Sequence, residues 1–133
     1  LDAARPTDEC ETKELLEWLT LDHRLMAKTE SLTLFEQRRL EILMRLVQRA
    51  ELIMLDEPVG GLSSSEVRLM ISLLSELKTR TGIFVIEHAM KVIRELADRV
   101  AVMIVGEKLM DGTPTDILRD KRVIDQYLGR AHA

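Results

Sequence analysis

The alternation of short apolar runs with amphipathic segments between Leu52 and Val105 most strongly limits the folds open to this chain. Apolar runs at 52–55, 83–86 and 100–105 have the length of buried strands. Apolar residues at helical spacing fill the segments between these runs. Strands that alternate with helices form βαβ units, in which the strands lie parallel and the crossovers are right-handed. The sequence therefore predicts an α/β fold with a parallel sheet flanked by helices.

Capping residues mark the starts of two predicted helices. Thr33 stands three residues before Glu36, which is the spacing of a capping box, and helical periodicity continues through Gln48. Ser63 and Glu66 repeat this spacing after the first predicted strand. Helices are therefore expected to begin at both positions.

The pattern before residue 50 is helical alone, with a first helix predicted over residues 7–19. We therefore expect a helical subdomain at residues 1–50 and an α/β core at residues 51–133. The joint between the two is placed near residues 49–51.

The chain beyond the third predicted strand is expected to turn at residues 106–107 into a short strand at 108–110. A second turn is predicted at 111–112. Two short helices should then run from a cap at Thr113 to about Leu128.

Charge and cysteine content narrow the classes of function. With 23 acidic and 19 basic side chains the formal net charge is −4, so the basic surplus that supports nucleic-acid binding is missing and no nucleic-acid partner is expected.

The single cysteine, Cys10, fits a reducing compartment, for which the cytosol is the default. The longest uncharged apolar run, residues 100–105, is far shorter than the roughly 20 residues of a membrane-spanning helix. No transmembrane segment is therefore predicted.

Ionisable residues end two of the predicted strands. Asp56 and Glu57 follow the first strand, and His88 follows the second. Because parallel strands place their carboxyl ends on one edge of a sheet, these side chains are expected to converge where open α/β sheets bind ligands. Two carboxylates there suit phosphoryl transfer, since one can support a metal-bound water and the other can orient or deprotonate the attacking water. A plain polar strand exit is the alternative for either feature taken alone.

Four stretches of the sequence carry a family resemblance. Residues 52–58, LIMLDEP, resemble a Walker B strand with its catalytic glutamate, and residues 60–63, GGLS, resemble the D-loop that follows it. Residues 85–88, VIEH, are similar to a switch strand with its histidine, and residues 36–42, EQRRLEI, match the helix after a signature motif. Together these motifs resemble the ATP-binding cassette (ABC) ATPases. The resemblance implies part of a P-loop NTPase-like core, its carboxyl-terminal half only, with a remnant of the helical signature subdomain.

The end of the chain is similar to particular subgroups of this family. Residues 112–118, GTPTDIL, and 123–129, VIDQYLG, are similar to the cassettes of branched-chain amino-acid and urea importers, with lipopolysaccharide-export cassettes as a near second. The resemblance therefore implies part of a nucleotide-binding subunit that, when complete, couples ATP hydrolysis to solute uptake. Its implied partners are transporter membrane subunits and a second cassette subunit, and its implied location is cytoplasmic, at the inner face of the cell membrane.

The resemblance also implies roles for individual residues. Asp56 would support the magnesium ion, Glu57 would be the general base, and His88 would sense the γ-phosphate of ATP. Gly61 and Ser63 would belong to the loop that signals across a cassette dimer.

The signature region departs from the family pattern. Thr33 would replace a serine hydroxyl, and Gln37 would be a further nucleotide-binding residue of this region. Phe35 stands where a glycine allows close approach of the backbone, and Glu36 adds a negative charge at a helix amino terminus that would otherwise attract an anion. We therefore expect a nucleotide contact that is weak or lost, with Thr33 and Glu36 serving only as a structural capping box.

A phosphate-binding P-loop requires the pattern G-x-x-x-x-G-K-[ST], and this sequence has none. The glutamine loop expected before the helical subdomain is missing too. ATP and Mg²⁺ would therefore act in a complete cassette, and this chain alone is expected neither to bind ATP tightly nor to hydrolyse it. No two glycines have the required separation of five positions; they are residues 60, 61, 82, 106, 112 and 129.

Two functional interpretations stay open. In the first, the chain is a piece of an importer-type cassette, and its start at Leu1 rather than methionine supports this. In the second, it is a non-catalytic interaction module that docks on a cassette or membrane subunit. In both cases a parallel sheet of few strands leaves apolar surface and a strand edge uncovered, so self-association is expected.

Overall fold

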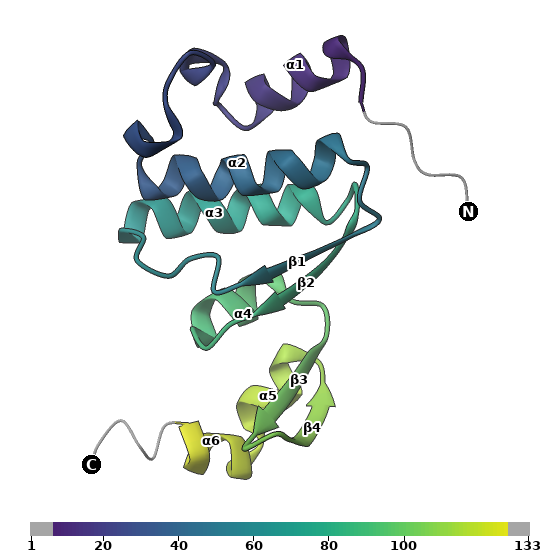
Figure 1. Cartoon of the computed structure of the whole chain (residues 1–133). Helices are drawn as coiled ribbons and strands as arrows, with labels where there is room; N and C mark the ends of the chain where they lie inside the picture. Colours follow the sequence, from purple (N-terminus) through teal and green to yellow (C-terminus); the bar gives the residue numbers. More distant parts are fainter. Residues whose placement is uncertain (1–6, 128–133) are drawn as a thin grey trace. The chain divides into compact units, whose positions relative to one another are not determined.

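The computed structural model describes residues 7–127 of the 133-residue chain (Figure 1). Its internal contacts divide the chain into two units, Leu1–Ile86 and Glu87–Ala133. Each unit has its own sheet and its own buried residues.

Helices of the first unit begin at side-chain caps. The side chains of Asp8, Thr33 and Ser63 each accept a hydrogen bond from the backbone N–H three residues on. The side chain of the glutamate at that position accepts the backbone N–H of the cap residue in turn. The capping boxes predicted at Thr33 and Ser63 are therefore confirmed. The elements are α1 (Glu9–Trp18), the 3₁₀ turns η1 (Asp22–Arg24) and η2 (Thr29–Ser31), α2 (Leu34–Val47) and α3 (Ser64–Leu77).

A parallel pair of strands forms the sheet of the first unit. β1 (Leu52–Asp56) and β2 (Gly82–Ile86) pair in register. Ile53 is 1% exposed whereas its neighbour Met54 is 68% exposed, because successive side chains of a strand point to opposite faces. Figure 1 shows α2 and α3 on one side of this sheet. The predicted α/β class, with a parallel sheet and flanking helices, is confirmed.

The core of the first unit lies on the covered face of the sheet. The helix α3 supplies four of its buried side chains at helical spacing, which is the pattern of an amphipathic helix. The buried apolar residues of this unit are Leu19, Leu21, Ile42, Leu43, Ile53, Val59, Met70, Ile71, Leu74 and Leu77.

The second unit is built on an antiparallel hairpin. Its strands are joined by Val105 and Gly106, which both have positive φ, as a type I′ hairpin turn requires. Val102, Ile117 and Val123 form its buried apolar cluster. The elements are α4 (Met90–Leu96), β3 (Val100–Ile104), β4 (Glu107–Gly112), α5 (Pro114–Arg119) and α6 (Lys121–Tyr127).

Details of this unit differ from the sequence-based expectation. Residues 100–105 are expected in the parallel sheet, but in the described part of the chain β3 pairs with β4 alone. The reason is local, because a two-residue turn returns β4 alongside β3 and supplies backbone partners without a crossover. The turn therefore precedes residue 107, and residues 111–112 belong to β4 rather than to a turn. Leu128 and Gly129, which belong to the predicted ending, lie outside the described residues.

The boundary between the two units, at Glu87, is not the joint predicted near residues 49–51. That joint separates subdomains by function, and the division into residues 1–50 and 51–133 stays a prediction. None of the described helices is long and apolar enough to cross a membrane.

Candidate functional site

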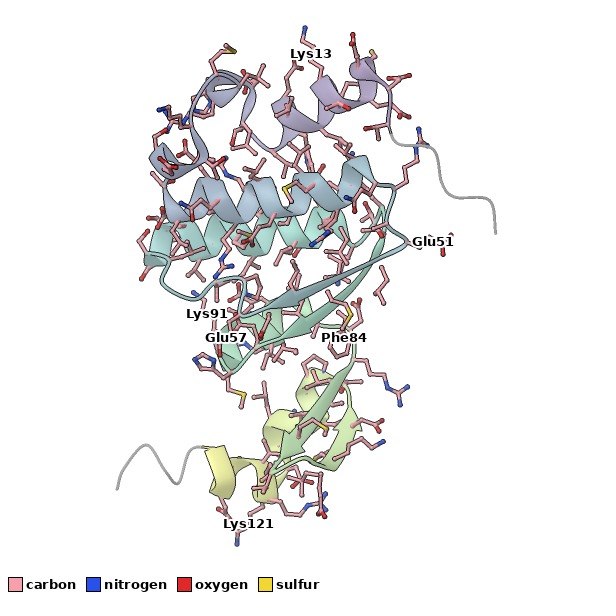
Figure 2. All side chains as sticks on the ribbon, in the orientation of Figure 1. Lys13, Glu51, Glu57, Phe84, Lys91 and Lys121 are labelled. Atoms are coloured by element: carbon pink, nitrogen blue, oxygen red, sulfur yellow. The ribbon has the colours of Figure 1, made fainter. Side chains whose placement is uncertain are left out.

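Two acidic residues lie at the carboxyl end of β1, of which Figure 2 labels Glu57. Asp56 is the last residue of the strand and Glu57 follows it, and both are exposed. Glu57 has a φ of 46°, in the left-handed region that non-glycine residues seldom adopt. Its N–H donates to the carbonyl oxygen of Ile86 at 2.9 Å, which continues the pairing of β1 with β2 and holds this conformation. Strained backbone of this kind concentrates at functional sites, so the geometry marks Glu57 as a candidate.

Two glycines shape the turn that follows. The N–H of Gly60 donates to the carbonyl oxygen of Glu57 at 2.9 Å, and a Cβ at position 60 would lie 3.2 Å from that oxygen. Gly61 has a φ of 77°, and a Cβ there would lie 2.9 Å from Cδ2 of Leu34. The structure thus brings Gly61 against the first residue of α2.

Ser63 is engaged as the cap of α3. Its hydroxyl contacts Oε2 of Glu66 at 2.6 Å, and its N–H donates to the same oxygen at 2.8 Å. These hydrogen bonds lower the pKa of Glu66. The Ser63 side chain therefore binds within its own helix, and its role in a cassette dimer stays a prediction.

The start of α2 is closed by a carboxylate of the same helix. Glu36 Oε2 accepts the N–H of Thr33 at 2.7 Å, and Thr33 Oγ1 accepts the N–H of Glu36 at 3.2 Å. Glu36 Oε1 lies 3.1 Å from Nε of Arg24 and 3.8 Å from Nε2 of His23. The hydrogen bond from the Thr33 backbone, aided by the charges of Arg24 and Arg39, lowers the pKa of Glu36. This helix terminus therefore carries a negative charge that is already paired.

The neighbouring side chains of this region also bind within the chain. Gln37 Nε2 donates to the carbonyl oxygen of Leu32 at 3.0 Å. The Arg39 guanidinium lies over the ring of Phe35, 4.4 Å from its centre. The nucleotide-binding roles of Thr33 and Gln37 stay predictions.

His88 lies in the second unit, between β2 and α4, and is exposed. The residue before it, Glu87, accepts two backbone N–H groups on Oε2, from His88 at 3.1 Å and from Ala89 at 3.2 Å. Sequence reasoning assigns Glu87 no role, because only its position beside the histidine could have signalled one. The expected convergence of His88 with Asp56 and Glu57, which lie in the first unit, stays a prediction.

The donor set at the end of β1 fits a magnesium ion in part. Asp56 supplies an exposed carboxylate, and Mg²⁺ is usually held by one or two carboxylates together with water and phosphate oxygens. Within residues 7–127, no three His, Cys, Asp or Glu side chains gather into a group that could hold a metal ion. The start of α2 does not fit a phosphate group, because Glu36 already places a negative charge there. The described residues therefore suit metal and water chemistry at β1 better than anion binding at α2.

The chain is similar to curated transport ATP-binding proteins. No family model matches it. It is 38% identical over 118 residues, 87% of this chain and 46% of the relative, to the high-affinity branched-chain amino acid transport ATP-binding protein LivG of Salmonella typhimurium. It is 39% identical over 98 residues, 72% of this chain and 38% of the relative, to the corresponding protein BraF of Pseudomonas aeruginosa. The chain thus spans less than half the length of these two curated relatives.

The fold is similar to that of a solved cassette. The ADP conformation of MJ1267, an ATP-binding cassette of an ABC transporter, superposes with a TM-score of 0.81 at 25% identity. The match covers 93% of this chain and 52% of that protein.

Proposed function

Because the sequence and the fold of this chain are those of part of an ATP-binding cassette ATPase, we propose that it is part of a nucleotide-binding subunit of an ABC transporter. In its complete form this subunit couples ATP hydrolysis to uptake of a solute of the branched-chain amino-acid or urea type. It works at the cytoplasmic face of the membrane with transporter membrane subunits and a second cassette subunit. The observation that carries the proposal is the acidic pair at the end of β1, with Glu57 held in a left-handed conformation.

In this proposal, different residues of the chain have different roles in phosphoryl transfer. When bound, ATP supplies the phosphoryl group that passes to water, and Mg²⁺ neutralises charge that develops on its oxygens. Asp56 would support the metal ion, and the carboxylate of Glu57 would accept the proton of the attacking water. His88 donates a hydrogen bond toward the γ-phosphate, and the turn with Gly61 and Ser63 faces the second cassette.

Co-expression of this chain with the amino-terminal part of a LivG-type relative tests the proposal. The purified complex should hydrolyse ATP, and Glu57→Gln should lower kcat by about 10²-fold or more, because the general base is lost. Glu51→Gln is the matched control, since this exposed glutamate lies just before β1 and should leave kcat unchanged. A complex that hydrolyses ATP equally well with Glu57→Gln would sink the assignment of the base.

The chain alone, in this proposal, neither binds ATP tightly nor hydrolyses it. The missing P-loop pattern and the paired carboxylate of Glu36 at the start of α2 support this. Calorimetric titration of the isolated chain with MgATP should give no heat beyond dilution. A measured affinity in the micromolar range would contradict the expectation.

A non-catalytic interaction module is the second candidate. The side chains at the start of α2 bind one another and the preceding loop, as the contacts of Glu36 and Gln37 illustrate, and this favours a structural role for the region. The same co-expression separates the two candidates. A stable complex that is insensitive to ATP and has no ATPase activity would favour the module.

Self-association of the isolated chain belongs to the same proposal. One face of the β1–β2 sheet carries apolar side chains that α2 and α3 do not cover, and Figure 2 shows Phe84 on the side away from these two helices. A parallel sheet is normally covered on both faces. A second copy of the chain can cover this face. Its apolar side chains and their exposed fractions are Leu52 56%, Met54 68%, Phe84 51% and Ile86 53%.

A further inference from the structure

The short connection between β2 and α4 is organised by one side chain. Glu87 Oε2 accepts the N–H of His88 at 3.1 Å and the N–H of Ala89 at 3.2 Å. Ala89 is the N-cap residue of α4 and makes no side-chain cap itself. A single carboxylate oxygen thus satisfies two consecutive backbone donors that precede the helix.

These two donors lie on either side of the α-carbon of His88. The N–H of His88 belongs to the peptide plane before that carbon, and the N–H of Ala89 belongs to the plane after it. Because peptide planes are rigid, holding both to one acceptor restricts φ and ψ of His88 together. His88 is exposed, so burial among other side chains does not fix its imidazole. The backbone that Glu87 holds therefore sets the direction in which the Cα–Cβ bond of His88 leaves the chain.

We propose that Glu87 is a positioning residue, whose carboxylate fixes the backbone at His88 and so sets the direction in which the His88 side chain leaves the backbone. This inference rests on the proposed role of His88 toward the γ-phosphate.

The second carboxylate oxygen of Glu87 supports the proposal. Oε1 is buried and has no hydrogen-bond partner within the part of the chain that the structure describes. A buried acceptor without a partner costs stability, and such groups are rare in native proteins. A residue that served stability alone would not be expected to leave a buried oxygen unpaired. A residue whose other oxygen must bind both backbone donors can leave it so. Glutamine has the same length and one amide oxygen, so it should keep both bonds to the backbone.

A simple cap of α4 would behave differently from a positioning residue. Loss of a cap would loosen the amides along Met90–Leu96. Loss of a positioning contact would free His88 and Ala89 while α4 stays formed. Faster amide exchange along Met90–Leu96 would therefore indicate a helix cap, and faster exchange at His88 and Ala89 alone would indicate a positioning residue.

Amide hydrogen exchange and backbone couplings of the whole 133-residue chain, measured by NMR, test the inference. Glu87→Ala should raise the exchange rates of the His88 and Ala89 amides by about tenfold, the factor expected when a hydrogen bond to a charged acceptor is lost. The φ-dependent coupling of His88 should move toward its motional average. Glu87→Gln should keep both values near those of the wild type.

Glu95→Ala is the matched control, because Glu95 is exposed on α4 and should leave both amides unchanged. Unchanged exchange in a folded Glu87→Ala chain, or a rise spread along α4, would overturn the inference. If Glu87→Ala does not fold, Glu87→Gln decides, and fast exchange at His88 in that variant would also overturn it. None of these measurements involves ATP, so they stand apart from the co-expression assay that tests the proposed function.

Discussion

At the scale of single residues, Glu36 changes what the start of α2 can bind. A helix amino terminus ordinarily favours anions because its N–H groups and dipole present positive charge. Here the terminus holds its own carboxylate, which contacts the N–H of Thr33 and the guanidinium of Arg24. The positive charge of this helix terminus is therefore already compensated by the carboxylate of Glu36.

Replacement of Glu36 by glutamine should make stability less dependent on pH. Glutamine can still accept the N–H of Thr33, but it removes the charge that faces His23, Arg24 and Arg39. The pKa of Glu36 is lowered in the folded chain, so ionisation adds stability above its ordinary value of 4.5. That contribution is lost as the pH falls through the lower folded pKa.

Denaturant unfolding at a series of pH values measures this effect. The wild type should be more stable than Glu36→Gln at pH 7, and the difference should shrink once the pH drops well below 4.5. Glu30→Gln, at an exposed position in η2, is the control and should show no such change. A difference between wild type and Glu36→Gln that does not vary with pH would refute the argument.

Some contacts of these residues could be predicted from their spacing in the sequence, and others could not. The Thr33–Glu36 box could be predicted because both partners lie within one helical turn. The ion pair of Glu36 with Arg24 could not, since the connection between them has no periodic pattern that places η1 against α2. The left-handed backbone of Glu57 was equally hidden, because no glycine marks that position.

At the scale of elements, the β3–β4 hairpin explains the main error of the sequence-based fold. The apolar run at 100–105 correctly predicts a strand, but it carries no information on which strand is the partner. Val105 is an unusual hairpin residue, so the turn lacked the Asn-Gly or Asp-Gly signal that would have revealed the pairing. An irregularity between Val102 and Met103 also shifts the register, which alternation alone does not predict.

Replacement of Val105 by asparagine should stabilise this hairpin. Val105 is 96% exposed and has a φ of 49°, a conformation that is costly for a β-branched side chain. Asparagine tolerates this region, so the free energy of unfolding should rise by about 1 kcal/mol.

Thermal or denaturant unfolding of the two chains provides the measurement. Val105→Thr is the matched control, because threonine is polar but still β-branched and should give little or no gain. Equal gains from asparagine and threonine would show that polarity, rather than backbone strain, is responsible.

At the scale of the whole molecule, each unit buries its own apolar cluster, yet within the first unit the described helices α2 and α3 cover only one face of the sheet. Parallel strands with one bare face are uncommon because both faces of such a sheet are usually apolar. The uncovered face could be foreseen from the apolar residues of β1 and β2. The division into two units could not, because it depends on contacts between distant residues.

Substitution of Phe84 on this face should weaken self-association. Light scattering over a range of concentrations should show that the wild type associates and that Phe84→Thr shifts the equilibrium toward monomer, since less apolar surface is removed from water. Leu69→Gln is the control, because Leu69 is 58% exposed on α3, outside the sheet face. A wild-type chain that stays monomeric at every concentration would rule out the association.

Gly61 brings the turn after β1 close to the first residue of α2. A Cβ at position 61 would lie 2.9 Å from Cδ2 of Leu34, so any larger residue there would require the Leu34 side chain to move. Glu57, whose backbone is already strained, lies a short distance back along the same turn. A side chain added at position 61 would therefore disturb the start of α2 and the turn that follows the acidic pair at the same time.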